Sequence, residues 1–316
     1  MSNDNNDDAS NTGKSFSTDK TSVIQSDTFK LRLAQAGQAP PSVLLLVGPA
    51  NSVGRQWPIE DTDRIIGRAP SCHIYVDERS MSKSHAKLVL ANGDVSVVDL
   101  ESTNKTMVNG KVIAALQPVR LKNNDQIKMG NVILKFLERG SIETVASAQT
   151  YDRSQTDALT GIANRGALET HAVELFKRAN LLGIPFSLLI FDIDKFKNIN
   201  DTHGHPTGDY VIKEIASVVR DKLIRENDFF ARAGGEEFVL VLLGSPLNRA
   251  QEVAERVRQT IQNHVFTFEG KTIPVTISAG VAVHKASDTG WEAVYDRADK
   301  AMYQSKNSGR NRVTVG

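Results

Sequence analysis

Cysteine, net charge and long apolar runs are all scarce in this chain of 316 residues. The single cysteine, Cys72, excludes an internal disulfide and fits a reducing compartment. The aliphatic run Val43–Val47 is far too short to span a bilayer, and the acidic, polar start of the chain does not resemble a signal peptide. A formal net charge of +1 gives no electrostatic reason to expect binding to nucleic acid or to a membrane. We therefore expect a cytoplasmic protein that binds neither.

Composition divides the chain into four parts, and its length suits two domains with connecting segments. Residues 1–40 are rich in Asn, Asp, Ser and Thr, so we expect a disordered tail. Residues 41–140 hold short β-rich runs separated by turns, which predicts an all-β sandwich. Residues 141–156 form a short polar linker with weak helical anchors, and residues 157–316 form the second domain. The expected strands of the sandwich are Val43–Val47, Arg64–Ile66, His73–Val76, His85–Leu90, Val95–Asp99, Ile127–Met129 and Val132–Leu137.

The most informative feature is the sequence Gly-Gly-Glu-Glu at residues 234–237. Apolar runs at Ser187–Asp194 and Phe238–Leu243 predict one strand before this motif and one directly after it. The glycine pair favours a tight turn with room for a phosphate beside backbone N–H groups. If the two strands are neighbours, Asp192 and Glu236 meet at one rim and can hold hard cations. Phosphoryl and nucleotidyl transfer both use such a site.

Several ordered blocks resemble the GGDEF family of diguanylate cyclases, in its GGEEF form. One departure is Gly166, where the family usually repeats an arginine, and this position lies outside the expected metal site. The resemblance implies an α+β domain with an antiparallel sheet, like the palm of nucleotide cyclases and polymerases. Its flanking helices include Thr207–Lys222 and Asn248–His264. Besides the glycine-glutamate motif, the blocks are Asp157–Arg165, Phe191–Asp201, Gly204–Asp209, Thr276–Gly280, Ala298–Asp299 and Lys306–Asn311.

The resemblance implies that two GTP molecules condense into cyclic di-GMP with release of two pyrophosphates. Two divalent ions per active site, Mg²⁺ or Mn²⁺, are implied as cofactors. Their expected ligands are Asp192, Glu236 and the backbone carbonyl of Ile193. Glu236 or Glu237 accepts the proton of the attacking hydroxyl, and the sequence does not decide between them. Asp194 shares the strand face of Asp192 and is expected to support the site.

Substrate recognition is also implied by the resemblance. Guanine needs an acceptor for its N1–H and exocyclic amine. Asn200 and Asp209, which flank a predicted turn, match the base-reading positions of the family, and His205 lines the same pocket. Lys306 and Arg310 stand at i and i+4 near the end of a predicted C-terminal helix, from which both reach the outer phosphates. The remaining substrate-binding candidates are Lys197, Gly234 and Gly235.

Two further features concern regulation and assembly. Arg225-Glu226-Asn227-Asp228 resembles the RxxD site at which cyclic di-GMP inhibits members of the family. Arg256 stands where a second arginine often completes that site, so Arg225, Asp228 and Arg256 are the product-inhibition candidates. Each domain of the family holds one nucleotide, so condensation requires a homodimer and a monomer is expected to be inactive.

The loops of the predicted sandwich carry the blocks Gly67-Arg68, Ser82–His85, Asp99–Asn104, Val108–Gly110 and Asp125–Ile127. These blocks resemble the forkhead-associated (FHA) family of phosphothreonine-binding domains. Recognition residues commonly lie on such loops above a rigid sheet. The sequence departs from the family at Lys105 and Asn124, both usually glycine, and these changes affect turn shape more than phosphate contacts. His85 is expected to be a structural brace. The phosphopeptide-binding candidates are Arg68, Ser82, Lys83, Thr103 and Asn104.

The tail supplies a candidate ligand for this domain. Ile24 follows Thr21 by three places, the spacing that FHA domains often recognise. Our hypothesis is that a Ser/Thr kinase phosphorylates Thr21 and that the phosphothreonine docks on the FHA domain of its own chain or of a partner. A phosphate adds about −1.5 to −2 charge, enough to order such a segment against Arg68.

Three alternatives stay open at this point. The second domain could be a catalytically silent receptor for GTP or cyclic di-GMP. The chain could act mainly as a phosphothreonine-dependent scaffold that recruits partner proteins. A third alternative is an active enzyme with a different product, such as a mixed cyclic dinucleotide, because one changed base contact can relax specificity.

Overall fold

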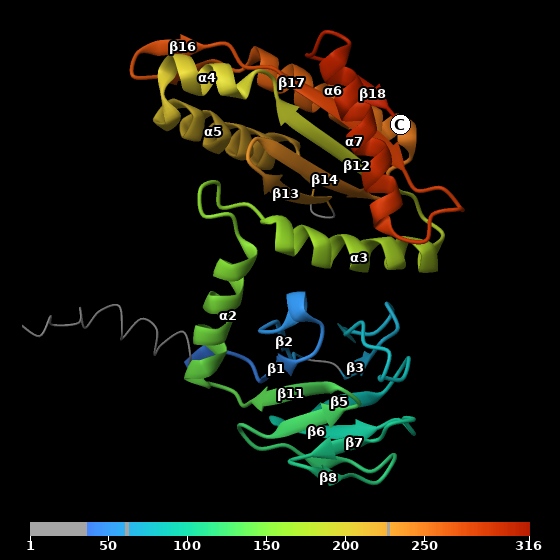
Figure 1. Ribbon diagram of the computed structural model, residues 1–316. Coiled ribbons are helices and arrows are strands. Elements are labelled where there is room, and N and C mark those ends of the chain that lie inside the picture. Colours follow the sequence, from blue (N-terminus) through green and yellow to red (C-terminus); the bar gives the residue numbers. More distant parts are fainter. Residues whose placement is uncertain (1–36, 61–62, 226–227) are drawn as a thin grey trace, which may run out of the picture.

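The computed structural model describes residues 37–60, 63–225 and 228–316. The proposed phosphosite Thr21 therefore lies outside the described residues. Figure 1 shows an N-terminal β domain and a C-terminal domain of helices around a sheet, joined through helix α2. The predicted fold class, an all-β sandwich followed by an α+β domain, is confirmed. No helix in the described part of the chain has the length and apolar character needed to cross a membrane.

The N-terminal domain is a sandwich of two sheets with one shared core. One sheet has the order β2-β1-β11-β10-β7-β8 and the other β4-β3-β5-β6-β9. Side chains of both, such as Leu45 and Leu134 from the first and Ile66 and Leu88 from the second, are fully buried in that core. The strands are β1 Ser42–Val47, β2 Gln56–Pro58, β3 Arg64–Gly67, β4 Ile74–Tyr75, β5 Ala86–Ala91, β6 Asp94–Asp99, β7 Thr106–Val108, β8 Lys111–Val112, β9 Val119–Arg120, β10 Gln126–Met129 and β11 Val132–Leu137.

The segment between the two domains forms a helix. Helix α2 spans Ile142–Gln155 and follows β11 after a short turn. Lys135 of β11 bonds both carboxylate oxygens of Glu143 at 2.8 Å, which ties the start of the helix to the sandwich. These contacts with folded neighbours explain why a polar sequence with little amphipathic pattern forms a helix.

The C-terminal domain has three layers. Its sheet has the order β13-β14-β12-β17-β18, and the eight residues of the central strand β12, Phe186–Ile193, are all buried. Leu189 and Phe191 of β12 face a core shared with α5 and α6, whereas Leu188 and Ile190 face one shared with α3 and α7. The other elements are α3 Arg165–Leu182, α4 Phe196–His203, α5 His205–Leu223, β13 Asp228–Gly234, β14 Glu237–Leu243, α6 Leu247–Asn263, β15 Phe266–Phe268, β16 Lys271–Ile273, β17 Ile277–Val283, α7 Trp291–Asn307 and β18 Val313–Val315.

Two local predictions were wrong in this domain. The expected turn from Asn200 to Gly208 is mostly helical, because α4 runs to His203 and α5 begins at His205, with only Gly204 between them. Arg310 does not share a helix with Lys306, because α7 ends at Asn307. The chain leaves the helix through Gly309, at φ 109°, and Arg310 itself is left-handed at φ 65°.

Candidate active site

The rim that carries the carboxylates forms where β12 and β14 end and begin. The two strands are antiparallel neighbours, which is the condition on which the sequence analysis based the shared rim, and Asp192 lies directly opposite Glu237 in their register. Glu236 precedes the strand in the turn after Gly235, whose φ is 46°. The N–H of Ile193 lies 3.4 Å from the carbonyl oxygen of Glu236. The motif therefore places its second glutamate, rather than its first, across from the aspartate.

Asp192 is buried and paired with a cation from α7. Its Oδ2 lies 2.8 Å from Nζ of Lys306. Burial and, to a smaller extent, the negative charges of Glu236 and Glu237 raise the pKa of Asp192 to about 6, against the opposing effect of Lys306. The carboxylates are thus close enough to interact, and the site favours an added positive charge.

The described residues contain no group of three or more His, Cys, Asp or Glu side chains that is already arranged around a metal position. Mg²⁺ is commonly held by one or two carboxylates together with substrate phosphates and water. Asp192 fits such a shared site, because its carboxylate is buried, its pKa is raised and it already pairs with the ammonium group of Lys306. The residues therefore fit a divalent ion that arrives with a phosphate ligand.

Asp194 follows the end of β12 and has a connecting role. Its carboxylate accepts hydrogen bonds from Oγ1 of Thr276 at 2.7 Å and from Oγ of Ser278 at 2.6 Å. It also accepts the backbone N–H of Asn311 at 3.0 Å. Asp194 thereby fixes the loop that carries Arg310 against the strand that carries Asp192.

A buried acceptor marks the expected base-reading position. Oδ1 of Asn200 is buried and has no hydrogen-bond donor among the described residues. Gly208 lies so close that a Cβ there would stand 1.9 Å from this oxygen. Asp209 and His205 are exposed on the first turns of α5. A buried unpaired acceptor is costly, and a ligand with N–H donors would satisfy it.

The basic residues do not converge on one point. Lys306 lines a cleft of about 580 Å³ together with Asp192, Glu237 and Asp299. Arg310 lines another cleft, of about 480 Å³, together with Asp194 and Asn311. Lys197 is exposed on α4. The expected phosphate contacts thus border two different clefts, one lined by Asp192 and the other by Asp194.

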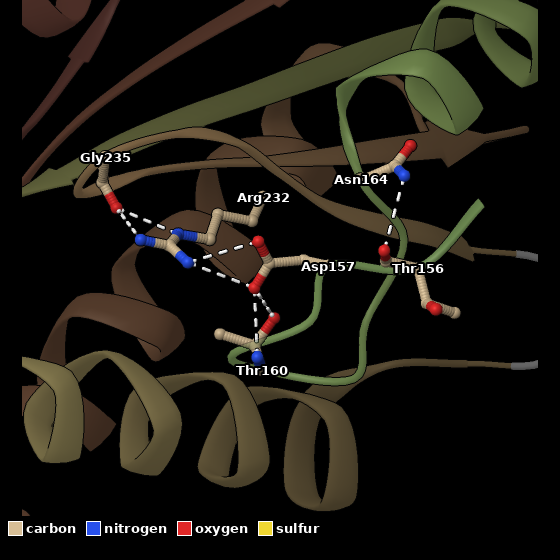
Figure 2. A network of polar contacts seen from close by, with 6 residues as sticks. All are labelled: Thr156, Asp157, Thr160, Asn164, Arg232 and Gly235. Atoms are coloured by element: carbon tan, nitrogen blue, oxygen red, sulfur yellow. Dashed lines mark hydrogen bonds and ion pairs between the residues drawn. The ribbon is translucent and has the colours of Figure 1, made fainter. Parts of the chain in front are cut away.

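An arginine to which the sequence analysis assigned no role stabilises the glycine turn. Arg232 donates through Nε and Nη2 to the carbonyl oxygen of Gly235, at 2.8 and 2.6 Å. Its Nη1 binds both carboxylate oxygens of Asp157, at 3.0 and 3.1 Å (Figure 2). Asp157 also accepts the N–H and the hydroxyl of Thr160. The turn is therefore connected to the residues that directly follow α2.

Comparison with known proteins agrees with this geometry. A family profile described as "Diguanylate cyclase, GGDEF domain" matches residues 154–312, half of the chain. The chain belongs to the GGDEF family. A second profile, for the FHA domain, matches residues 64–130, so an FHA domain precedes the GGDEF domain.

Two curated relatives and one solved structure illustrate the similarity. The chain is 42% identical over 163 residues to the diguanylate cyclase DgcP of Pseudomonas aeruginosa, covering 52% of this chain and 24% of the relative. It is 38% identical over 189 residues to diguanylate cyclase A of Treponema denticola, covering 56% and 51%. The coiled coil and GGDEF domain of DgcB from Caulobacter crescentus, solved with c-di-GMP, is 32% identical, with a TM-score of 0.52 over 55% of this chain and 93% of that one. The chain thus spans about half or less of the curated relatives' length.

The product-inhibition candidates of the GGDEF domain lie near one another. Asp228 begins β13, and its Oδ2 accepts the N–H of Arg225 at 3.1 Å. Burial raises the pKa of Asp228, while the positive charges of Arg225 and Arg256 lower it. Residues 226 and 227 lie outside the described part of the chain.

The candidate residues of the FHA domain gather at one end of the sandwich. Oγ of Ser82 accepts the N–H of Thr103 at 3.1 Å, and the Asn104 amide donates to the carbonyl of Ser80 at 2.7 Å. His85 is fully buried, and its Nδ1 accepts the N–H of Ser82, so it braces this loop. The backbone N–H of Arg68 bonds the carbonyl of Ser82. The side chains of Arg68 and Lys83 are exposed on these joined loops.

The departures from the FHA sequence pattern fall on special backbone conformations. Lys105 has φ 54° and Asn124 has φ 72°. Both are left-handed conformations that glycine adopts without a steric cost. The turns therefore keep the shape expected for glycine although the residues differ.

Besides Arg232, the sequence interpretation missed Tyr295 of α7. Its hydroxyl donates to Oε1 of Glu237 at 2.6 Å. The position of Arg232 two residues before the glycine pair was an available signal for its role. Nothing local in the sequence connects Tyr295 with Glu237, because 58 positions separate them.

Proposed function

We propose that this chain is a diguanylate cyclase that condenses two GTP molecules into cyclic di-GMP and two pyrophosphates. The observation that supports this most is the rim of the GGDEF domain, where buried Asp192 faces Glu237 across two strands and pairs with Lys306. Membership of the GGDEF family and about 40% identity to named diguanylate cyclases support the same activity.

The cofactors in this proposal are divalent ions, Mg²⁺ or Mn²⁺, two per active site. Asp192, Glu236 and the carbonyl of Ile193 would hold them, and when bound they would polarise the α-phosphate and acidify the attacking 3′-hydroxyl. Glu236 and Glu237 are the bases available to take the hydroxyl proton. The ammonium group of Lys306, which is paired with Asp192, would form an ion pair with an incoming phosphate instead.

Guanine recognition is assigned to the junction of α4 and α5. The unpaired Oδ1 of Asn200 would accept an N–H of guanine, and Asp209 would accept another. Adenine lacks the N1–H and carries its exocyclic amine at C6 rather than at C2, so it would leave the acceptor unpaired. Lys197, His205, Gly234, Gly235 and Arg310 complete the proposed substrate contacts.

Catalysis requires two protomers in this proposal. Each GGDEF domain binds one nucleotide, so the two reacting groups come together only when two domains face each other. Product inhibition would act through Arg225, Asp228 and Arg256, where two guanidinium groups near one carboxylate suit a ligand with phosphates and guanine bases.

Regulation through the FHA domain is supported by its contacts with α3. Arg55 of the FHA domain pairs with Glu174, and Lys177 binds Asp77 and the hydroxyl of Tyr75. We call these pairs the α3 latch. Pro70, two residues after Arg68, lines a cleft of about 560 Å³ together with Lys177 and other residues of α3. A phosphothreonine segment bound at Arg68, from the protein's own Thr21 or from a partner, would act on this contact.

A continuous assay of pyrophosphate release tests the cyclase proposal. Full-length protein with GTP and Mg²⁺ should release pyrophosphate, and Asp192→Asn should release none. Nucleotide binding without release, also after treatment with a Ser/Thr kinase, would replace the proposal with a receptor. Binding of phosphoproteins with neither GTP binding nor turnover would instead favour a scaffold.

A further inference from the structure

A tyrosine lies behind the second glutamate of the motif. Oη of Tyr295 donates a hydrogen bond to Oε1 of Glu237, and the two oxygens are 2.6 Å apart. Tyr295 comes from α7, whereas Glu237 is the first residue of β14. Hydrogen bonds to ionised acceptors are short and about twice as strong as neutral ones. This contact is therefore a strong constraint on the direction of the carboxylate.

The tyrosine is itself held by buried neighbours. Its ring meets that of Trp291, one turn earlier on α7, edge to face, with centroids 5.5 Å apart. Trp291 is 8% exposed and belongs to the core between α3, α7 and the sheet. The phenol ring thus has little rotational freedom, and its hydrogen bond therefore restricts the orientation of the Glu237 carboxylate.

The hydroxyl is a donor over the physiological pH range. Burial raises the pKa of Tyr295, and the hydrogen bond and negative charge of Glu237 raise it further. A carboxylate has about four lone-pair directions. The hydrogen bond from Tyr295 uses one of these lone pairs, so the Glu237 carboxylate keeps lone pairs that can bind a cation.

We propose that Tyr295 is a positioning residue that fixes the Glu237 carboxylate opposite Asp192 for binding a divalent ion. In the register of the strands these are facing residues, so a freely rotating Glu237 would lose entropy when it joins Asp192 at a shared cation. Because the hydrogen bond already fixes the carboxylate in the folded protein, this side-chain entropy is lost on folding and not on ligand binding. This inference rests on the metal site proposed above and adds Glu237, named there only as a candidate base, to the residues that hold the cation.

The test measures metal binding directly and compares Tyr295→Phe with the wild type in two backgrounds. Full-length protein is saturated with a GTP analogue that carries a methylene bridge between the α- and β-phosphates, so no turnover occurs. Free Mn²⁺ is then followed by electron paramagnetic resonance to give its dissociation constant. The same measurement is made with Glu237→Gln and with the double variant, and thermal unfolding checks that every protein is folded. Phenylalanine preserves the ring and its contact with Trp291, so the unfolding midpoint should change little.

We expect Tyr295→Phe to weaken Mn²⁺ binding about 10-fold, the range seen for partners behind metal ligands. In the Glu237→Gln background the same change should weaken it less than about 2-fold, because the carboxylate that Tyr295 orients is gone. Unchanged affinity in the wild-type background, or an equal loss in both backgrounds, would overturn the inference. If the wild type itself binds no Mn²⁺ with the analogue, the proposed metal site fails, which is a separate result.

Discussion

Arg232 holds the carbonyl oxygen of Gly235 with two N–H groups, at 2.8 and 2.6 Å, while its remaining nitrogen binds Asp157. Asp157 stands two residues after the end of α2. One guanidinium thus connects the segment that follows the interdomain helix with the turn that precedes Glu236. A movement of α2 relative to the sheet would therefore change the position of the turn at Gly234 and Gly235.

Replacement of Arg232 by lysine should reduce the cyclase rate about 100-fold, since displacements of about 1 Å at a reacting centre have that effect. Lysine keeps the charge but cannot bond Gly235 and Asp157 at the same time. The measurement is the initial rate of cyclic di-GMP formation at saturating GTP. Arg249→Lys, at an exposed ion pair on α6, is the matched control and should keep the wild-type rate. Equal rates for the two variants would show that the turn needs no support from Arg232.

Substitution of Gly208 by alanine should raise the KM for GTP and lower the free energy of unfolding by about 1–3 kcal/mol, a typical cost of overpacking. The added Cβ would stand 1.9 Å from Oδ1 of Asn200 and would displace the proposed guanine acceptor. Gly166→Ala, in the first turn of α3, is the control, because its Cβ would stand 3.4 Å from Oδ1 of Asn164, an ordinary contact distance. That variant should gain roughly 0.5–1 kcal/mol of stability from helix propensity. An unchanged KM in a stable Gly208→Ala protein would argue against base recognition at Asn200.

Without metal, the protein should lose stability as pH rises from about 4 to about 6. The pKa of Asp192 is raised by burial to about 6 in the folded protein, above its usual value of about 3.9 in an unfolded chain. Between these values the folded state holds more protons than the unfolded state, so the free energy of unfolding falls with rising pH. Urea unfolding at pH 4.5 and 7 should show a larger loss for the wild type than for Asp192→Asn. Parallel losses would mean that Asp192 ionises normally.

The response to a phosphopeptide should depend on the α3 latch. A peptide of residues 16–27 phosphorylated at Thr21 should change the wild-type rate, whereas the unphosphorylated peptide should not. In the double variant Glu174→Gln, Lys177→Met the effect of the phosphopeptide should shrink, because both pairs with the FHA domain are lost. Rates are compared at a saturating concentration of peptide. Binding without any change of rate in the wild type would separate the FHA domain from control of the cyclase.

Product inhibition should disappear when Arg225 is replaced by alanine. The structure places Arg225 and Arg256 near Asp228, away from the carboxylate rim, so the uninhibited rate should stay within about 2-fold of the wild type. The measurement is the initial rate at increasing cyclic di-GMP. A variant with the same inhibition curve as the wild type would remove these residues from the proposed site.

The parts of the molecule that the sequence predicted are those with long, uniform patterns. Strands β12 and β14 follow continuous apolar runs, and because they are neighbours the carboxylates beside them meet. Strands β2, β7, β8 and β9 were not predicted, because two or three residues show no periodicity. Arg310 was placed on a helix because the spacing from Lys306 fits one, although the backbone turns left-handed there.

The contacts that position the site could not be predicted. Tyr295 meets Glu237, and Arg232 meets Asp157, across 58 and 75 positions of sequence. Such pairs depend on how α7 and the segment after α2 lie on the sheet, which no local pattern specifies. The candidate site residues therefore carry a local sequence signal, whereas the residues that contact them do not.

The most direct test of the cyclase account is the identity of the product. Purified full-length protein, with and without prior treatment by a Ser/Thr kinase, is incubated with GTP and Mg²⁺. The nucleotides are then separated by chromatography and identified by mass spectrometry. We predict that the wild type forms cyclic di-GMP and releases two pyrophosphates per molecule formed. The variant Glu236→Ala should form no cyclic di-GMP. Intact GTP under both conditions, or GDP in place of a cyclic dinucleotide, would contradict the account.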